Sequence, residues 1–345
     1  MNKKQVSLQF KTFAMDCIGS SRIYEFLSHR ISKDHQILEL SMNTKNGQPV
    51  PNLLFAAVHY LLLKGKDHPL KEFYPSVSEH PRKIDESDIF TNFKAFCLEY
   101  KDDVVYMLQN KLVQTNEVRR CAYLYPVFCW IYNKIEKPLS LIEIGTSAGL
   151  QLLWDHFSYS YGDTKIYGNK QSDIHLTSEI RGESQVNFLP NPPLVASKVG
   201  VDLHISHLED AEDYLWLKAL IWPEHRERLE LLEHAAKCLK KNPVKLIEGD
   251  GVALFPEIIE TIPKDSAICI FHTHVANQIP KESKTQLEEN IKAIGRSRDV
   301  FHLYNNMWDG DLHLDYIIRG EEHNRTIGKT DGHGRWFEWN IENVD

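Results

Sequence analysis

From residue 139 onward, short apolar runs alternate with longer segments whose apolar residues recur every three or four positions. Five runs have the length of buried strands, namely 139–144, 199–203, 245–248, 267–273 and 300–304. The segments 211–239, 252–262 and 280–294, which lie between the later runs, have the helical period. Strands that alternate with helices predict a parallel sheet covered on both faces, with right-handed crossovers. We therefore expect a doubly wound α/β domain.

The first 137 residues have a helical pattern instead. Asn52 to Lys64 is apolar nearly all round, which predicts a buried helix, and we expect its His59 to be a core histidine. Asn116, or the threonine before it, can cap a later helix that Pro126 should kink or divide. These residues predict a helical region that walls the active site of the domain that follows.

Two further segments depart from the strand–helix alternation. Residues from about 160 to 195 are rich in Gly, Asn, Pro, Tyr and Ser, and apolar positions between 174 and 180 alternate with polar ones, which predicts an inserted β-hairpin. The segments 312–319 and 335–341 also alternate, which predicts an antiparallel strand pair at a sheet edge. We expect a mostly parallel, seven-stranded sheet, with a domain boundary between 1–137 and 138–345.

Composition narrows the class of protein. The chain has 345 residues, 42% of them hydrophobic, which is enough for one large or two moderate cores. A net charge of -8 with scattered basic residues argues against nucleic acid as the main partner. We find no export or membrane segment, and six dispersed cysteines without a CxxC pair are typical of a reduced cytoplasm. A small-molecule substrate is the expected partner, and the sequence does not indicate the oligomeric state.

The stretch LSLIEIGTSAGLQLLWD, from Leu139 to Asp155, carries the most distinctive chemistry. It is predicted to be a strand, a turn of small residues and a helix, and such a turn presents backbone N–H groups to a ligand. Three interpretations compete: an ordinary βα turn, a GxSxG nucleophile elbow with Ser147 as the nucleophile, and the loop of a nucleotide-type cofactor site.

The other strand ends help to separate these interpretations. In a doubly wound sheet the ligand lies beyond the carboxyl ends of the strands, where Asp202, Asp250, His272 and His274 are expected. Two carboxylates on successive strands can accept hydrogen bonds from ribose hydroxyls and from an adenine amino group. A hydrolase would use Ser147 with Asp250 and one of the histidines, but several strands would then precede the nucleophile, where this chain is predicted to be helical.

These motifs resemble known families. EIGTSAG, VGVDLH, EGDG and HTHV are similar to the first four motifs of the class I S-adenosylmethionine-dependent methyltransferases, over about residues 139 to 341. The whole chain, through PNLLFAAVHYLLL, QTNEVRRCA, GTSAGLQLLWD, IWPEHRERL and FHTHVANQIP, resembles the uncharacterised bacterial family DUF2332. The resemblance implies a methyltransferase-like Rossmann sheet, S-adenosylmethionine as cofactor and methyl transfer to a small molecule. A catalytically inactive binding protein with the same fold is the alternative.

The resemblance also implies roles for individual residues. The residues expected at the cofactor are Glu143, Gly145, Thr146, Ser147, Gly149, Asp202, Asp250 and Gly251, with Glu143 and the loop at the methionine part, Asp202 at the ribose and Asp250 at the adenine. From the residues themselves, His272 and His274 are expected on one face unless the strand has already ended, as a general base with its partner or as two metal ligands, and a structural role for at least one of them is the alternative. We assign no metal. Asn116, Glu117 and Arg120 are expected to lie within reach of the same site, where Arg120 needs a carboxylate, a substrate anion or solvent to compensate its charge.

Overall fold

The computed structural model describes residues 1–83, 86–182 and 185–341. The chain forms two compact units, Met1–Thr115 with His207–Glu230, and Asn116–Ser206 with Leu231–Asp345. This division differs from the expected boundary at residue 137. Residues 116–137 belong to the sheet unit, and 207–230 return to the helical unit, because their helix packs on the buried helix that contains His59.

The helical unit is built around one buried helix, α4 (Val50–Leu63). Its other elements are α1 (Lys3–Asp16), α2 (Arg22–Ile31), α3 (His35–Ser41), η1 (Pro69–Phe73), α5 (Glu86–Glu99), α6 (Lys101–Asn110) and α8 (Ala211–Leu220), and α9 (Arg226–Lys241) begins in it. Phe55 of α4 stacks on Tyr24 of α2 at 4.1 Å between ring centroids. The His59 ring contacts the carbonyl of Ala219 and the hydroxyl of Ser76, which confirms a core histidine.

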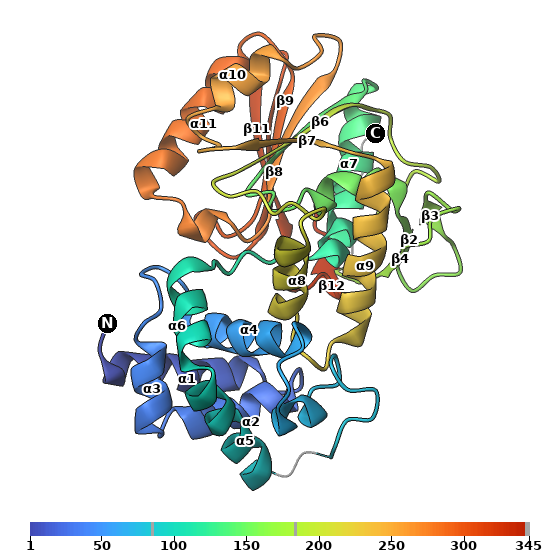
Figure 1. Cartoon of the computed structure of the whole chain (residues 1–345). Coiled ribbons are helices and arrows are strands. Elements are labelled where there is room, and N and C mark those ends of the chain that lie inside the picture. The colour runs from blue at the N-terminus through green and yellow to red at the C-terminus, as the bar shows by residue number, and fades with distance from the viewer. Residues whose placement is uncertain (84–85, 183–184, 342–345) are drawn as a thin grey trace. The chain divides into compact units, whose positions relative to one another are not determined.

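The second unit contains a seven-stranded sheet with the order β11-β10-β9-β8-β1-β6-β7 (Figure 1). Its strands are β1 (Leu139–Ile144), β6 (Val195–Asp202), β7 (Lys245–Glu248), β8 (Ala267–His272), β9 (Val300–Tyr304), β10 (Leu312–Ile318) and β11 (Glu321–Gly328). The first five are parallel, and β10 is antiparallel to both of its neighbours. The expected mostly parallel, seven-stranded sheet is thereby confirmed. The strand order reverses between β1, β6 and β8, so the ends of these strands are where a ligand is expected.

Helices cover both faces of the sheet (Figure 1). Helices α10 (Phe255–Glu260) and α11 (Lys281–Gly295) pack on one face through Phe255, Leu287 and the isoleucines of β1 and β8. Helix α7 (Cys121–Ile135) lies on the other face, with the Phe128 ring against Phe271. Pro126 does not divide α7, and the Ala122 carbonyl that Pro126 cannot bond accepts a hydrogen bond from Tyr161 at 2.8 Å.

The segment after β1 differs from the expected helix and hairpin. Residues Leu150–His156 form a 3-10 helix, η3, and β2 (Ser158–Ser160), β3 (Tyr167–Gly168) and β4 (His175–Thr177) form a small sheet in which β4 is parallel to β2. β5 (Glu179–Arg181) pairs with β12 (Trp336–Glu338) in parallel. The alternating residues between 174 and 180 therefore belong to two different sheets and do not form the predicted hairpin with each other. Residues 183 and 184 lie outside the described part.

The C-terminal strand pair is also formed by other residues than expected. β10 pairs with β11, which lies between the two segments that were predicted to pair, whereas β12 is in a different sheet. Arg319 and Gly320, both with positive φ, form the two-residue turn between β10 and β11. β11 is a mostly exposed edge strand, so it lacks the apolar alternation that reveals a half-buried strand.

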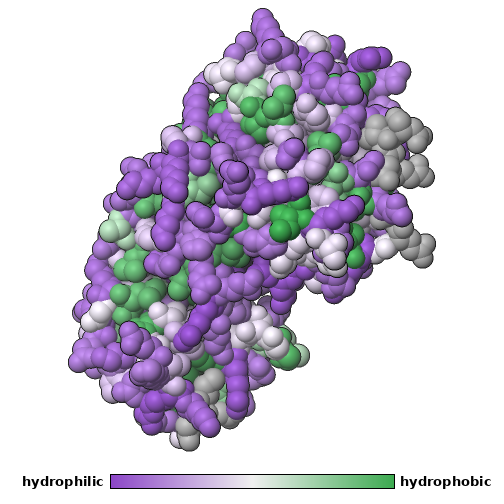
Figure 2. Space-filling view, turned by 90° about the vertical axis from the view of Figure 1, so that its right-hand side faces the viewer, coloured by the Kyte–Doolittle hydropathy of each residue, from purple (hydrophilic) through white to green (hydrophobic). Residues whose placement is uncertain are grey.

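One face of the molecule is mainly polar. The face drawn in Figure 2 is mostly hydrophilic, and its hydrophobic residues form separate patches. No helix in the described ranges is both long and apolar enough to cross a membrane. Large apolar side chains are concentrated in the interior, where the largest fully buried ones include Trp154, Trp339 and Tyr24.

Candidate functional site

The turn after β1 is a tight loop that requires small residues. Gly145, Ser147 and Gly149 have φ of 74°, 52° and 78°, in the left-handed region that favours glycine. A Cβ on Gly145 would lie 2.4 Å from a methyl carbon of Val275, so glycine is needed for that close approach. The space beside Gly145 is therefore occupied by the side chain of Val275.

Glu143 lies in the interior and not on the surface of the loop. Its side chain is 3% exposed and accepts a hydrogen bond of 2.6 Å from the hydroxyl of Thr146. Burial raises the pKa of Glu143 to about 8, so the carboxyl group is mostly protonated at neutral pH. Thr146 is fully buried, so both residues support the loop from within.

Asp202, at the end of β6, holds the same loop from the side. Its carboxylate accepts the backbone N–H of Ser147 at 2.8 Å and that of His204 at 3.2 Å. Burial raises the pKa of Asp202, although these hydrogen bonds oppose the shift. The residue remains partly exposed, so its carboxylate can both fix the loop and contact a ligand.

Asp250 and the nearby glycines serve local packing. The Asp250 carboxylate is exposed and accepts the backbone N–H of Val252 at 2.8 Å, as in an Asx turn. A Cβ on Gly251 would lie 3.0 Å from Ile144, and one on Gly149 would lie 2.9 Å from Leu246. Of these residues, only Asp250 presents a polar side chain at the surface.

The hydroxyl of Ser147 has no general base among its hydrogen-bond partners in the described chain. Its hydroxyl is 3.5 Å from the hydroxyl of Ser206, and the residue is 3% exposed. Among the described residues, no histidine is hydrogen-bonded to Ser147, and His272 Nε2 lies within hydrogen-bond distance of His302 Nε2. The sequence order expected for a hydrolase therefore does not correspond to an assembled triad.

His272 and His274 do not both lie in the strand, so the condition for their side chains to share a face is not met. β8 ends at His272, and His274 has φ of 57°, which turns its backbone out of the strand. His272 Nε2 lies 3.0 Å from His302 Nε2, and burial lowers the pKa of His272 to about 3. No group of three or more His, Cys, Asp or Glu in the described part of the chain is arranged to hold a metal ion.

His274 belongs to a different polar cluster. Its backbone N–H donates to Asn305 Oδ1 at 2.7 Å, and its Nδ1 lies 3.0 Å from Asn306 Nδ2. Asn306 has φ of 56°, so left-handed, non-glycine residues follow each of β1, β8 and β9: Ser147, His274 and Asn306. Such strained conformations concentrate at functional sites, and these three lie at the carboxyl ends of neighbouring strands.

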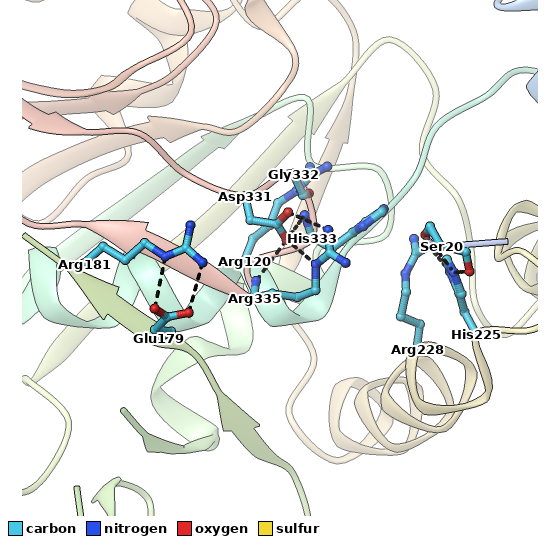
Figure 3. A network of polar contacts seen from close by, with 10 residues as sticks. All are labelled: Ser20, Arg120, Glu179, Arg181, His225, Arg228, Asp331, Gly332, His333 and Arg335. Atoms are coloured by element: carbon cyan, nitrogen blue, oxygen red, sulfur yellow. Dashed lines mark hydrogen bonds and ion pairs between the residues drawn. The ribbon is translucent and has the colours of Figure 1, made fainter. Parts of the chain in front are cut away.

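Of Asn116, Glu117 and Arg120, which precede α7, the first and the last donate hydrogen bonds to backbone carbonyls of loops at this edge of the sheet. Asn116 Nδ2 donates to the carbonyl of Thr146 at 2.6 Å, and its Oδ1 is buried without a partner in the described chain. Arg120, in η2 (Val118–Arg120), donates from Nε to the carbonyl of Gly332 at 2.9 Å (Figure 3). Glu117 is buried and caps η2 by accepting from the N–H of Arg119.

Several further polar residues at this edge were not predicted from the sequence. Thr273 donates to Gln151 at 3.0 Å, and the Tyr123 hydroxyl is buried beside Thr273 and Asn305. Asn305 directly follows a buried strand, the same signal that indicated Asp202, and could have been found in that way. Gln151 is the one polar residue within an apolar run, which also marks it for attention.

The loop 331–335 folds over Arg120 and is held by its own ion pair. Although burial opposes ionisation, hydrogen bonds from Arg335, one of them 2.8 Å long, lower the pKa of Asp331 to about 2. The Asp331 carboxylate also accepts the N–H of His333 at 3.1 Å (Figure 3). Gly334 passes so close to Arg119 that a Cβ there would lie 2.6 Å from the Arg119 carbonyl oxygen.

Residues 8–339 match the family model described as "Uncharacterized protein conserved in bacteria (DUF2332)". The chain belongs to the DUF2332 family. A stretch of 100 residues in this DUF2332 chain is 25% identical to the Protein translocase subunit SecA of Ectopseudomonas mendocina (strain ymp). That stretch is 28% of this chain and only 11% of SecA, so the match spans about a tenth of that protein. No solved structure gives a significant match.

Proposed function

We propose that this DUF2332 chain transfers a methyl group from S-adenosylmethionine to a small-molecule acceptor. One observation carries the proposal: a partly exposed Asp202 at the end of β6 holds the loop after β1 through the N–H of Ser147. The loop lies where the strand order reverses, which is the usual ligand position in a doubly wound sheet. An acid and a tight loop at this place suit a nucleoside cofactor.

The residues fit the nucleoside end of the cofactor better than its methionine end. Asp202 and Asp250 follow neighbouring strands, and neither is fully buried, so their carboxylates can accept from ribose hydroxyls and an adenine amino group. Glu143 is bonded to Thr146, and Val275 covers Gly145, so these two residues do not face a ligand directly. The methionine end would be held by the polar residues after β8 and before α7 instead.

The chain's own groups would bind and orient, while the cofactor, when bound, supplies an electrophilic methyl group. Methyl transfer depends chiefly on aligning the acceptor atom with that group, for which rigid positioning residues suffice. Asn116, Arg120 and His274 come from two different segments and are held by hydrogen bonds to the backbone or to amide side chains. These fixed polar groups would line the part of the site where the methionine end of the cofactor and the acceptor meet.

The acceptor is taken to be a small molecule, and the proposed location is the cytoplasm. Acidic residues outnumber basic ones, 48 to 40, which does not favour a nucleic-acid substrate. All six cysteines are free thiols and five are buried, as suits a reducing compartment. A catalytically inactive binding protein would share these features, and only turnover separates it from an enzyme.

Calorimetry with S-adenosylmethionine, S-adenosylhomocysteine and 5′-methylthioadenosine on the full chain tests the cofactor. We expect all three to bind, and Asp202→Asn to weaken each by about tenfold or more, because a hydrogen bond to a charged group contributes roughly 1.5–3 kcal/mol. Glu257→Gln, which removes an exposed charge on α10, is the matched control and should bind as the wild type does. Absence of binding by all three compounds to folded wild-type protein would reject the proposal.

A further inference from the structure

Arg120 is a buried cation that forms no ion pair with a carboxylate of the described residues. Its side chain is 7% exposed, and no carboxylate of the described residues lies within ion-pair distance of it. It donates to two carbonyl groups, of Gly332 at 2.9 Å and of Thr273 at 3.4 Å, and to the Thr273 hydroxyl at 3.4 Å. Buried charges are normally paired, because neutral groups compensate only part of the lost hydration.

The acidic groups in the surroundings do not supply that pairing. Glu143 is close enough to sense the charge of Arg120, but burial keeps its pKa at about 8 and the group mostly neutral. Asp331 is bound to Arg335 by two side-chain hydrogen bonds. Among the described residues, no ionised carboxylate is therefore available to pair with Arg120.

His274 adds an unpaired donor beside Arg120. The Asn306 amide nitrogen donates to Asn305 Oδ1 at 3.2 Å and lies 3.0 Å from His274 Nδ1, so Nδ1 is the acceptor in that contact. Burial, with the nearby charges of Arg120 and His333, lowers the pKa of His274 to about 3, so the ring is neutral. Its proton is then on Nε2, which is buried and has no partner in the described residues.

The two groups lie next to each other through shared neighbours. Arg120 bonds the carbonyls of Gly332 and of Thr273, the residue directly before His274. A Cβ on Gly332 would lie 3.9 Å from His274 Cε1, so the ring also contacts the Gly332 position. Arg120 and His274 therefore share the neighbours Gly332 and Thr273, and a guanidinium with a neutral N–H donor near it is suited to bind an anion.

We propose that Arg120 and His274 bind a carboxylate group of the ligand. One guanidinium matches the single charge of a carboxylate, and the His274 N–H adds a second, neutral donor. This inference rests on the proposed function, because that function requires a small molecule to bind at this edge of the sheet. The carboxylate belongs either to the acceptor or to the amino-acid end of the cofactor, and the two sources can be separated.

Acetate is the direct probe of this receptor and does not depend on methyl transfer. We would follow the side-chain nitrogen signals of ¹⁵N-histidine-labelled full-length protein during titration with sodium acetate, with sodium chloride at equal ionic strength as reference; His274→Gln assigns the signal. Acetate should shift the His274 Nε2 signal saturably in the wild type and in Arg119→Gln, a matched loss of charge next to the site. The shift should disappear in Arg120→Gln.

Equal responses to acetate and chloride in the wild type would overturn the proposal, as would an unchanged acetate response in Arg120→Gln. Arg120→Lys is the second variant if the glutamine variant does not fold. The lysine keeps the positive charge but lacks the planar guanidinium, which can donate two parallel hydrogen bonds to a carboxylate. We therefore expect Arg120→Lys to bind acetate about tenfold more weakly, or more weakly still. The wild-type titration by itself decides the outcome if neither variant folds.

The two nucleosides identify the source of the carboxylate, because 5′-methylthioadenosine lacks the carboxylate that S-adenosylhomocysteine carries. Weaker binding of S-adenosylhomocysteine alone to Arg120→Lys assigns the carboxylate to the cofactor, and unchanged binding of both compounds assigns it to the acceptor. If neither compound binds the wild type, the methyltransferase proposal fails, while the acetate titration still decides the carboxylate receptor.

Discussion

The carboxylate of Asp202 accepts the backbone N–H of Ser147 at 2.8 Å, which ties the end of β6 to the loop after β1. Ser147 occupies a left-handed conformation that is unfavourable for a residue with a side chain. The hydrogen bond from Asp202 therefore stabilises a strained turn at the point where the sheet would receive its ligand.

Removing this carboxylate should destabilise the loop. Asp202→Ala leaves the Ser147 N–H without its acceptor, so we expect a loss of roughly 1–3 kcal/mol in the free energy of unfolding. Asp202→Asn should retain most of the stability, because the amide oxygen can accept the same N–H. Urea denaturation measures both, with the exposed Asp163→Ala as control, and equal losses for Asp202→Ala and Asp163→Ala would contradict the role.

The close approach of Gly145 to Val275 predicts a double-mutant effect. Gly145→Ala should cost roughly 2–4 kcal/mol, since it adds a contact of 2.4 Å and a side chain at φ of 74°. Val275→Ala in the same chain should restore the part due to the clash but not the part due to the backbone. Gly310→Ala, where a Cβ meets nothing within 4 Å, is the control. Additive effects of the two changes would show that the contact does not matter.

Glu143 should make stability fall as pH rises. Its pKa is raised from 4.5 to about 8 by burial, so between these values the folded state keeps a proton that the unfolded state releases. This contribution is fully present below pH 4.5 and is lost through pH 8, at no more than about 1.4 kcal/mol per pH unit. Glu143→Gln keeps an acceptor for Thr146 without a titrating group.

The measurement is denaturant unfolding of both proteins from pH 5 to 9. The stability of Glu143→Gln relative to the wild type should increase with pH and level off above about pH 8. A difference that is constant across this range would show that Glu143 is not protonated in the folded protein.

Ser147 should be unreactive toward reagents for serine nucleophiles. Its hydroxyl is buried, and in the described chain it is hydrogen-bonded to Ser206 and to no histidine. We expect no labelling by a fluorophosphonate probe under conditions that label a serine esterase completely, as measured by intact-protein mass spectrometry. Stoichiometric labelling that is lost in Ser147→Ala would favour a hydrolase instead.

The positions of the central parallel strands β1, β8 and β9 could be derived from the sequence because each is a short, nearly continuous apolar run that is buried along its length. β7 at the sheet edge is the exception, because its two apolar residues lie between two charged ones. The small residues after β1 were also informative, since a tight turn needs them at Gly145 and Gly149. Asp202 was placed at its strand end by counting along one run.

Other features depend on partners that are distant in the sequence. β11 is a polar edge strand defined by its pairing with β10, and β5 pairs with β12 more than 150 residues away, which no local period encodes. Arg120 was expected to need a carboxylate, a substrate anion or solvent, but only the folded chain decides that its hydrogen-bond partners include the carbonyls of Thr273 and Gly332. The burial that neutralises Glu143 and His274 likewise comes from packing of residues far apart along the chain, because desolvation depends on the surrounding atoms and not on neighbours in sequence.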